Sequence, residues 1–294
     1  MSRMTEGLPS MDNDRTDFTN LPPELILAIA DYLQISDIYR MVQICRSACH
    51  SLNPYLYRRD SLAICLGAKN GSIASVQMAL SHGTDVNGRA PGEAHRHEVH
   101  GRSALALAAE NGNTEVVQLL LRQPGIKVDT RSGSELTPVE YATKNAHPAI
   151  VELLLADDRV DVNQEPYFGT PLVLVAAFWG HVEIVRILSE HVDVNIGAKS
   201  PSGFTALHMA TMTGHIQVVN MLLAHDNVDV NCLDKNGFSA LHLAALNGHA
   251  TVITALLGHE HVDVNVRDFE GCTAHQRALE VGHIDCVKQL VSRM

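Results

Sequence analysis

The stretch Gly237–His249 reads GFSALHLAALNGH, and close copies of it recur along the chain at one constant spacing. Gly203–His215 (GFTALHMATMTGH) begins 34 residues earlier, and Gly271–His283 begins 34 residues later. The same step leads back to copies that begin at Gly169, Glu135 and Gly101. A fixed period of this length is typical of a stacked array of small repeats, so this stretch decides the fold.

Each unit is predicted to hold two short helices. Ser239 can accept a hydrogen bond from a free backbone N–H at the start of the first helix. Leu241, Ala244 and Ala245 then fall at helical spacing, so they form one buried face, and Gly248 suits a left-handed helix end. A second apolar helix and an Asp-Val-Asn turn follow. A unit this small must stack on its neighbours to bury a core, which predicts an all-α solenoid of paired helices with hairpin fingers.

The repeated motif and its Val-Asp-Val-Asn endings resemble ankyrin repeats, with one residue more than the usual period. The resemblance covers about residues 60–294. The sequence GTDVN at Gly83–Asn87 implies an additional first copy. We therefore expect a disordered N-terminal tail at 1–17, a separate segment at 18–60, and an array of about seven repeats at 61–294 with an insertion at 88–99.

Several copies depart from the pattern, and only His208 and His242 fill its His column. The fourth copy has Val173 and Leu174 in the columns that other copies fill with Leu and His, so it could also be read one residue out of register. The last copy carries Gln276 and Arg277 on its first helix and ends soon after. These polar residues favour a polar terminal cap, which such arrays need for solubility.

Residues 18–60 have a different pattern of apolar residues and helix-start signals, which predicts three helices. Pro22 and Pro23 fit a helix start, Ser36 can cap a second helix, and Asn53 and Pro54 can start a third. The sequence LPPELILAIADYL, followed by VQICR, resembles an F-box. The resemblance implies contacts with a Skp-type adaptor, and through it with a cullin complex, by Leu21, Pro22, Leu25, Ile29, Ile38, Val42 and Cys45. A generic helical cap on the array is the alternative.

Composition limits the kinds of partner and compartment. The net charge is −11 and no run of Lys and Arg is present, which argues against nucleic acid as a partner. The longest apolar run, Leu172–Trp179, is far shorter than the roughly 20 residues of a membrane span. The six cysteines form no CxxC pair and no signal sequence is apparent. We expect a cytoplasmic or nuclear protein that is monomeric apart from its complex.

No pattern of catalytic or cofactor-binding residues is found, so we expect neither an enzyme nor a cofactor. His95, His97 and His100 invite a metal interpretation, but their Gly- and Pro-containing stretch favours a mobile loop without metal. Seven of the other 14 histidines fall into two repeat columns. His147, His181, His215, His249 and His283 form one column, and His208 and His242 form the other. Recurrence favours structural roles, with the rings bonded to neighbouring backbone or hydroxyl groups.

The ankyrin resemblance implies that a partner would contact the residues beside each repeat glycine and the two residues before each Gly-His. These positions are filled by Tyr167, Phe168, Phe178, Trp179, Phe204, Met212, Phe238, Leu246 and Phe269. Seven of the 13 aromatic residues are among them, whereas the expected core is aliphatic. Aromatic side chains are enriched at interfaces. A binding groove on the fourth to sixth copies is therefore our hypothesis, and packing of repeat against repeat is the alternative.

The resemblances together favour a substrate receptor of an SCF-type ubiquitin ligase. The F-box-like segment would dock the adaptor, the array would hold a target protein, and ubiquitin transfer would follow from proximity. An ankyrin scaffold with no role in ubiquitin transfer is the alternative. Trp179, the only tryptophan, is the residue that we expect to anchor the partner.

Overall fold

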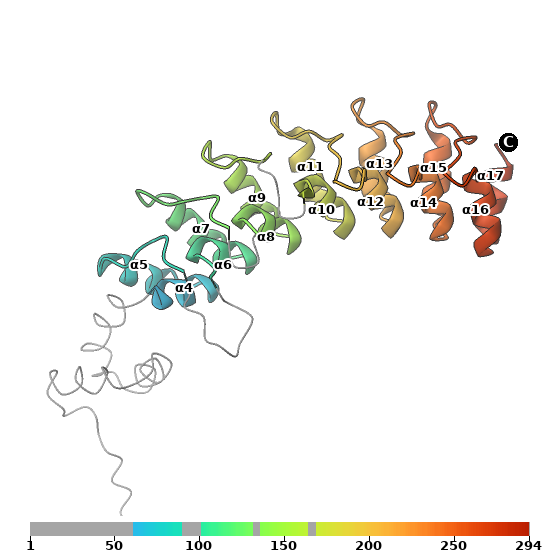
Figure 1. Cartoon of the computed structure of the whole chain (residues 1–294). Coiled ribbons are helices and arrows are strands. Elements are labelled where there is room, and N and C mark those ends of the chain that lie inside the picture. Colours follow the sequence, from blue (N-terminus) through green and yellow to red (C-terminus); the bar gives the residue numbers. More distant parts are fainter. Residues whose placement is uncertain (1–60, 90–100, 132–135, 164–168, 294) are drawn as a thin grey trace, which may run out of the picture.

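The computed structural model describes residues 61–89, 101–131, 136–163 and 169–293 (Figure 1). The predicted tail at 1–17 and the F-box-like segment at 18–60 lie outside these residues, and so do all seven proposed adaptor contacts. Tyr167, Phe168 and the histidines His95, His97 and His100 also lie outside them. The predictions made for these residues therefore stay predictions.

The described residues form 14 α-helices that follow one another in seven pairs. The pairs are α4 (Leu62–Lys69) and α5 (Ile73–Ser81), α6 (Ala104–Glu110) and α7 (Thr114–Leu121), α8 (Pro138–Lys144) and α9 (Pro148–Leu155), α10 (Leu172–Trp179) and α11 (Val182–Glu190), α12 (Ala206–Thr213) and α13 (Ile216–Leu223), α14 (Ala240–Leu246) and α15 (Ala250–Gly258), and α16 (Ala274–Val281) and α17 (Ile284–Val291).

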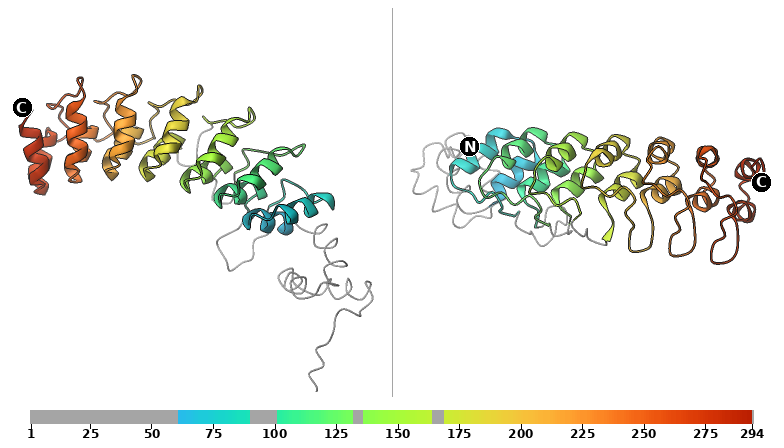
Figure 2. Two further views of the ribbon diagram at one scale, coloured as in Figure 1. Left: turned by 180° about the vertical axis from the view of Figure 1, so that it is seen from behind. Right: turned by 90° about the horizontal axis from the view of Figure 1, so that it is seen from above.

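The pairs stack in chain order into one curved row (Figure 1). The first helix of each pair packs on the first helix of the next pair, and the second helices pack in the same way. The view from above in Figure 2 shows the connecting loops extending to one side of the helices. This arrangement confirms the predicted all-α solenoid, in which each repeat contacts its neighbours.

The first helices from α6 to α16 begin at a constant interval of 34 residues, which confirms the repeat step. The fourth copy keeps this register. Its first helix begins at Leu172, Pro171 occupies the N-cap column, and Leu174 is fully buried in the column where other copies place His. Pro171 has no hydroxyl, so this helix lacks a side-chain cap.

The predicted helix signals have the predicted geometry. The Ser239 hydroxyl accepts a hydrogen bond from the His242 backbone N–H at 3.4 Å. Gly248 has a φ of 75°, the left-handed region that glycine adopts without steric cost. Ala146 fills the same column in the third repeat with a φ of 59°. The core between the helices is aliphatic, and Tyr141 is the one aromatic side chain that the described helices bury there.

The Asp-Val-Asn turns join successive repeats through their asparagines. The Asn163 side-chain amide donates to the Asp193 carbonyl at 2.8 Å, and the Asn231 amide donates to the His261 carbonyl at 2.7 Å. The Asn231 side-chain oxygen also accepts from the Asp263 backbone N–H at 2.8 Å. The prediction that this motif serves hairpin geometry is confirmed, because Asn163 and Asn231 each bond their own turn to the next.

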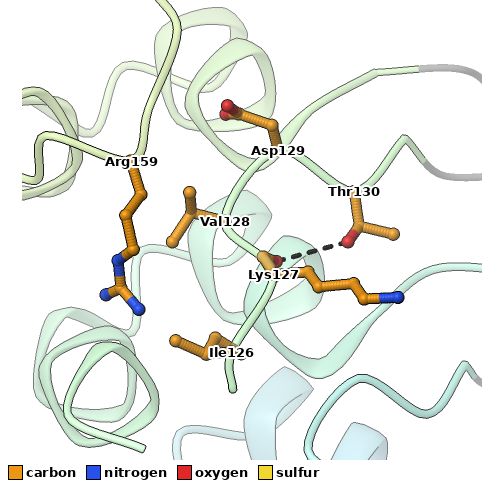
Figure 3. Close-up of a pocket in the computed structure, with 6 residues that line it drawn as sticks. All are labelled: Ile126, Lys127, Val128, Asp129, Thr130 and Arg159. Atoms are coloured by element: carbon orange, nitrogen blue, oxygen red, sulfur yellow. Dashed lines mark hydrogen bonds between the residues drawn. The ribbon is translucent and has the colours of Figure 1, made fainter. Parts of the chain in front are cut away.

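Asp129 replaces asparagine in this column of the second repeat. Figure 3 shows its side chain beside Val128, at the edge of a hollow that Arg159 also lines. Its carboxylate accepts a hydrogen bond from the Asp161 backbone N–H at 3.0 Å. An ionised carboxylate cannot donate the second bond that asparagine makes. Partial burial outweighs that accepted bond, so the pKa of Asp129 is raised.

We predict that Asp129→Asn stabilises the array by about 1 kcal/mol at pH 7, since an asparagine amide can donate as well as accept. Because the pKa of the native Asp129 is raised, its ionised form opposes folding at neutral pH and its protonated form does not. The gain should therefore shrink as the pH falls through that pKa. Urea unfolding of both proteins at pH 7 and at acidic pH measures it.

Asp158→Asn is the matched control, because it removes the same charge from an exposed side chain of the neighbouring repeat. If the two substitutions stabilise the protein equally, then net charge and not the asparagine column explains the effect. A loss of stability in Asp129→Asn would contradict the assignment of this column.

The last repeat only partly matches the predicted polar cap. Arg277 is held by three carboxylates, but Leu279, Val281, Ile284 and Val291 are at least half exposed. Leu279 lies one period after Ala245, which the last repeat covers completely. The end of the array thus presents the kind of apolar surface that interior repeats bury.

Candidate functional site

The candidate contact residues lie at the C-terminal ends of the first helices. Phe178 and Trp179 end α10, Met212 lies at the end of α12, and Leu246 ends α14. We name these four residues the helix-end strip. The side chains of Phe178 and Trp179 are 38% and 50% exposed, and Met212 and Leu246 are partly exposed. Because α12 packs between α10 and α14, the strip crosses three neighbouring repeats.

The two rings at the end of α10 order each other. Their centroids are 5.4 Å apart and their planes stand at 90°, the edge-to-face geometry that aromatic pairs favour. The preceding Ala176 and Ala177 are fully buried, so this part of the helix packs against its neighbours. The rings therefore stand on a fixed base and offer apolar surface to solvent.

A column of histidines holds the backbone beneath the strip. The Nε2 atoms of His215, His249 and His283 lie 3.0–3.1 Å from the carbonyl oxygens of Phe178, Met212 and Leu246, respectively. A carbonyl only accepts, so Nε2 carries the proton in each case. His147 and His181 make the same bond to Glu110 and Lys144. The predicted structural role of this column is confirmed.

The glycines before His181 and His215 suit this contact by space as well as by conformation. A Cβ on Gly180 would lie 2.6 Å from the imidazole of His215, and a Cβ on Gly214 would lie 2.7 Å from that of His249. Both glycines also have positive φ. The Gly-His motif thus lets the imidazole of one repeat lie flat against the helix end of the repeat before it.

The second histidine column is buried and structural. Nδ1 of His242 accepts from the Ser239 backbone N–H at 3.3 Å, and Nε2 lies 3.0 Å from the Cys272 carbonyl. His208 makes the equivalent bonds in its repeat. Burial lowers the pKa of both imidazoles. Nδ1 of His208 and of His242 also lies 2.8 and 2.9 Å from the hydroxyls of Thr205 and Ser239, respectively. Both imidazoles therefore join the start of their own helix to the next repeat.

The predicted contact residues on the loops separate into packed and exposed rings. Phe204 and Phe238 lie against the imidazoles of His208 and His242, with centroids 5.9 and 6.0 Å apart. Both rings are partly buried, so packing within the array accounts for them in part. Phe269 is 76% exposed on its hairpin. Among the described residues, those predicted as one groove therefore form two sets, which are the rings on the loops and the helix-end strip.

Charged groups bound the strip at its two ends. Lys144 occupies the equivalent slot in the third repeat and is exposed. In the last repeat, Arg277 binds the carboxylates of Asp268 and Glu270 at 2.6 Å and that of Glu280 at 2.9 Å. One guanidinium against three carboxylates leaves this cluster net acidic. The sequence did not reveal this cluster, because its members are irregularly spaced.

The described residues contain no other site that suggests chemistry. Within them, no group of three or more His, Cys, Asp and Glu side chains is placed to hold a metal ion. The hollow in Figure 3 is lined by Ile126–Thr130 and Arg159, and the Thr130 hydroxyl in it donates to the Lys127 carbonyl at 3.3 Å. Across the described ranges, none of the helices combines the length and the apolar character that a bilayer span requires.

We predict that His249→Ala destabilises the array by about 1–2 kcal/mol, since it leaves the Met212 carbonyl without its partner. His249→Asn is the matched variant, because Asn113 fills this column in the second repeat and donates to the Ala68 carbonyl at 2.7 Å. Chemical unfolding should show that Asn retains much of the stability that Ala loses. Equal losses would mean that packing of the imidazole, not its hydrogen bond, matters.

Comparisons with known proteins agree with this architecture. The family model described as ankyrin repeats (3 copies) matches residues 62–166, 141–234 and 226–294. No curated protein matches the chain. The crystal structure of an ankyrin repeat domain from Acinetobacter baumannii AYE is similar, with a TM-score of 0.58 and 26% identity over 64% of this chain and 96% of that chain. The chain therefore belongs to the ankyrin-repeat family.

Proposed function

We propose that this protein binds a protein partner through the helix-end strip. Ankyrin repeats imply a scaffold for protein–protein interaction, and such domains are typically binding modules without catalytic activity. The observation that carries the proposal is the exposed pair of Phe178 and Trp179 on a backbone that histidines hold in place. Tryptophan is over-represented among the residues that dominate binding energy.

The strip is suited to binding because its side chains and backbone are already held in place before a partner binds. The rings already stand edge to face, and the Phe178 carbonyl is bonded to the next repeat. Preorganised contact groups lose less entropy on association than flexible ones. With 38% of Phe178 and 50% of Trp179 exposed, a partner could cover roughly 200 Å² on the two residues together, which would contribute roughly 5 kcal/mol before the costs of association.

We predict that a Phe178→Ala, Trp179→Ala double variant loses its partner and keeps its fold. Both rings are exposed at the end of a helix, so truncation opens no cavity in the core. Quantitative proximity labelling in cells should show one set of proteins lost from the double variant. Val192→Ala, at a side chain 92% exposed in the same repeat, is the control and should retain that set.

A stability measurement decides how a loss is interpreted. If the double variant unfolds at the same urea concentration as the native protein, the lost contacts belong to binding. If it is destabilised by more than about 2 kcal/mol, the rings serve packing within the array, and the proposed contact surface is wrong.

We also propose that the protein is the substrate receptor of an SCF-type ubiquitin ligase in the cytosol or nucleus. The support is the sequence of residues 18–60, whose LPPELILAIADYL and VQICR resemble an F-box. In this proposal Leu21 and Pro22 contact a Skp-type adaptor, and a cullin complex then receives the target held by the array. An ankyrin scaffold without this role is the competing proposal.

The adaptor interaction gives a direct test. We predict that the purified full chain co-elutes with the Skp-type adaptor of its own organism on size exclusion, and that a Leu21→Ala, Pro22→Ala double variant binds at least tenfold more weakly. Failure of the native chain to bind the adaptor would leave the scaffold proposal standing alone. Undiminished binding by the variant would show that other residues form the interface.

A further inference from the structure

We infer that the segment bound by the helix-end strip is an amphipathic α-helix that lies along the array, with its basic end over the last repeat and its acidic end over the third. This inference rests on the proposed function of the strip as the contact surface. It follows from three features of the described residues, which are the spacing of the strip, the hydrogen bonds already made around it, and the charges at its ends.

The spacing of the strip matches the pitch of a helix. α10, α12 and α14 pack side by side, and packed helices lie about 8–10 Å apart. The strip therefore offers an apolar side chain at about that interval. An α-helix presents equivalent side chains on one face every seven residues, which is about 10.5 Å along its own axis. If the helix axis is inclined to the array by about 20°, this interval becomes about 10 Å along the array. An extended strand presents them every ~6.6 or ~13 Å and does not match.

A polyproline II segment repeats every ~9.3 Å, so spacing alone does not exclude it. The hydrogen bonds already made around the strip favour a helical ligand over it. The Thr213 hydroxyl donates to the Met209 carbonyl at 2.9 Å, and the Asn247 amide donates to the Leu243 carbonyl at 2.8 Å. The carbonyls beneath the strip are bonded to the histidine column. Few groups remain to pair with a partner's backbone.

This lack of free polar groups favours a helical ligand. A polyproline II or extended peptide has no internal backbone hydrogen bonds, so it would press unpaired N–H and C=O groups onto an apolar surface at considerable cost. An α-helix pairs its own backbone and needs only apolar contact along one face. Aromatic, Met and Leu side chains together suit such a face, as in other helix-in-groove complexes.

The charges at the two ends set the direction of the helix. Glu270 and Glu280 are 74% and 50% exposed in the Arg277 cluster, which is net acidic. Lys144 is exposed at the opposite end, beyond Phe178. Charge complementarity places basic residues of the ligand near the last repeat and acidic residues near Lys144, because a like-charge contact costs affinity and slows association.

The test uses a phage-displayed library of random 16-residue peptides, selected against the full chain and in parallel against the Phe178→Ala, Trp179→Ala variant. We expect peptides that are enriched only on the native chain, with apolar residues at i, i+3 or i+4, and i+7. A synthetic peptide from this set should gain helical circular dichroism on binding. If it lacks Trp, the emission of Trp179, the only tryptophan in the chain, reports the titration.

The outcomes separate the inference from the proposed function. If both proteins enrich the same peptides, the strip is not the contact surface and the proposed function fails. The enriched peptides could instead depend on Phe178 and Trp179 but have apolar residues at every second position, or carry PxxP. In that case the proposed function stands and the inference of a helical ligand is wrong.

Charge reversal tests the direction. Lys144→Glu should weaken a peptide with an acidic end about three- to tenfold at low salt and less at high salt. Glu270→Lys should do the same for its basic end, and Val192→Ala should change neither. Melting curves of each variant check the fold. If both reversals leave binding unchanged, or strengthen it, the proposed orientation is overturned.

Discussion

The structure depends on one hydrogen bond that joins neighbouring repeats. It links the histidine that starts the second helix of one repeat to a carbonyl at the end of the first helix of the repeat before it. Five successive repeats make it, from His147 to His283, at 3.0–3.2 Å. In the second repeat the Asn113 amide donates to the Lys69 carbonyl at 3.0 Å and to the Ala68 carbonyl at 2.7 Å. A single repeat buries too little apolar surface to fold alone. The bond fixes the register in which repeats stack, and the glycine that ends the first helix of the preceding repeat, as Gly180 does opposite His215, gives the ring room to approach.

This bond also relates stability to binding. The carbonyls that accept it belong to Phe178, Met212 and Leu246, whose side chains form the strip. The backbone at each contact position is therefore held by its own helix and by the next repeat. Its side chain is free to vary, because nothing in the stacking requires a particular residue there. Lys144 and Glu280 show this in the same slot. The fold thus separates a constant frame from a variable surface.

The sequence predicted the frame well because every repeat must make the same contacts. The period, the Ser and Thr caps, the Gly-His motif and the Asp-Val-Asn turns recur for that reason, and the structure confirms them. Exposure was harder to predict. Phe204 and Phe238 share the properties that drew attention to Phe178, yet they lie against buried imidazoles.

Such differences arise from contacts between residues whose spacing follows no period. The Arg277 cluster joins carboxylates at sequence separations of nine, seven and three residues, which no repeat pattern marks. Asp129 is a single departure from the asparagine column. The rise in its pKa follows from its burial and its hydrogen bond, which the sequence does not show. The F-box-like segment at 18–60 lies outside the described residues, so its role depends on the resemblance of its sequence.

The place of the strip in the array has a further consequence. In a solenoid, stability comes from each repeat and its contacts with its neighbours, so end repeats open more easily than central ones. α10, α12 and α14 each have a first helix on both sides, whereas the last repeat leaves Leu279 and Val291 exposed. A strip on the central repeats survives when an end repeat opens. A partner bound there stabilises the repeats whose order it requires, so binding and the local stability of the fourth to sixth repeats are linked.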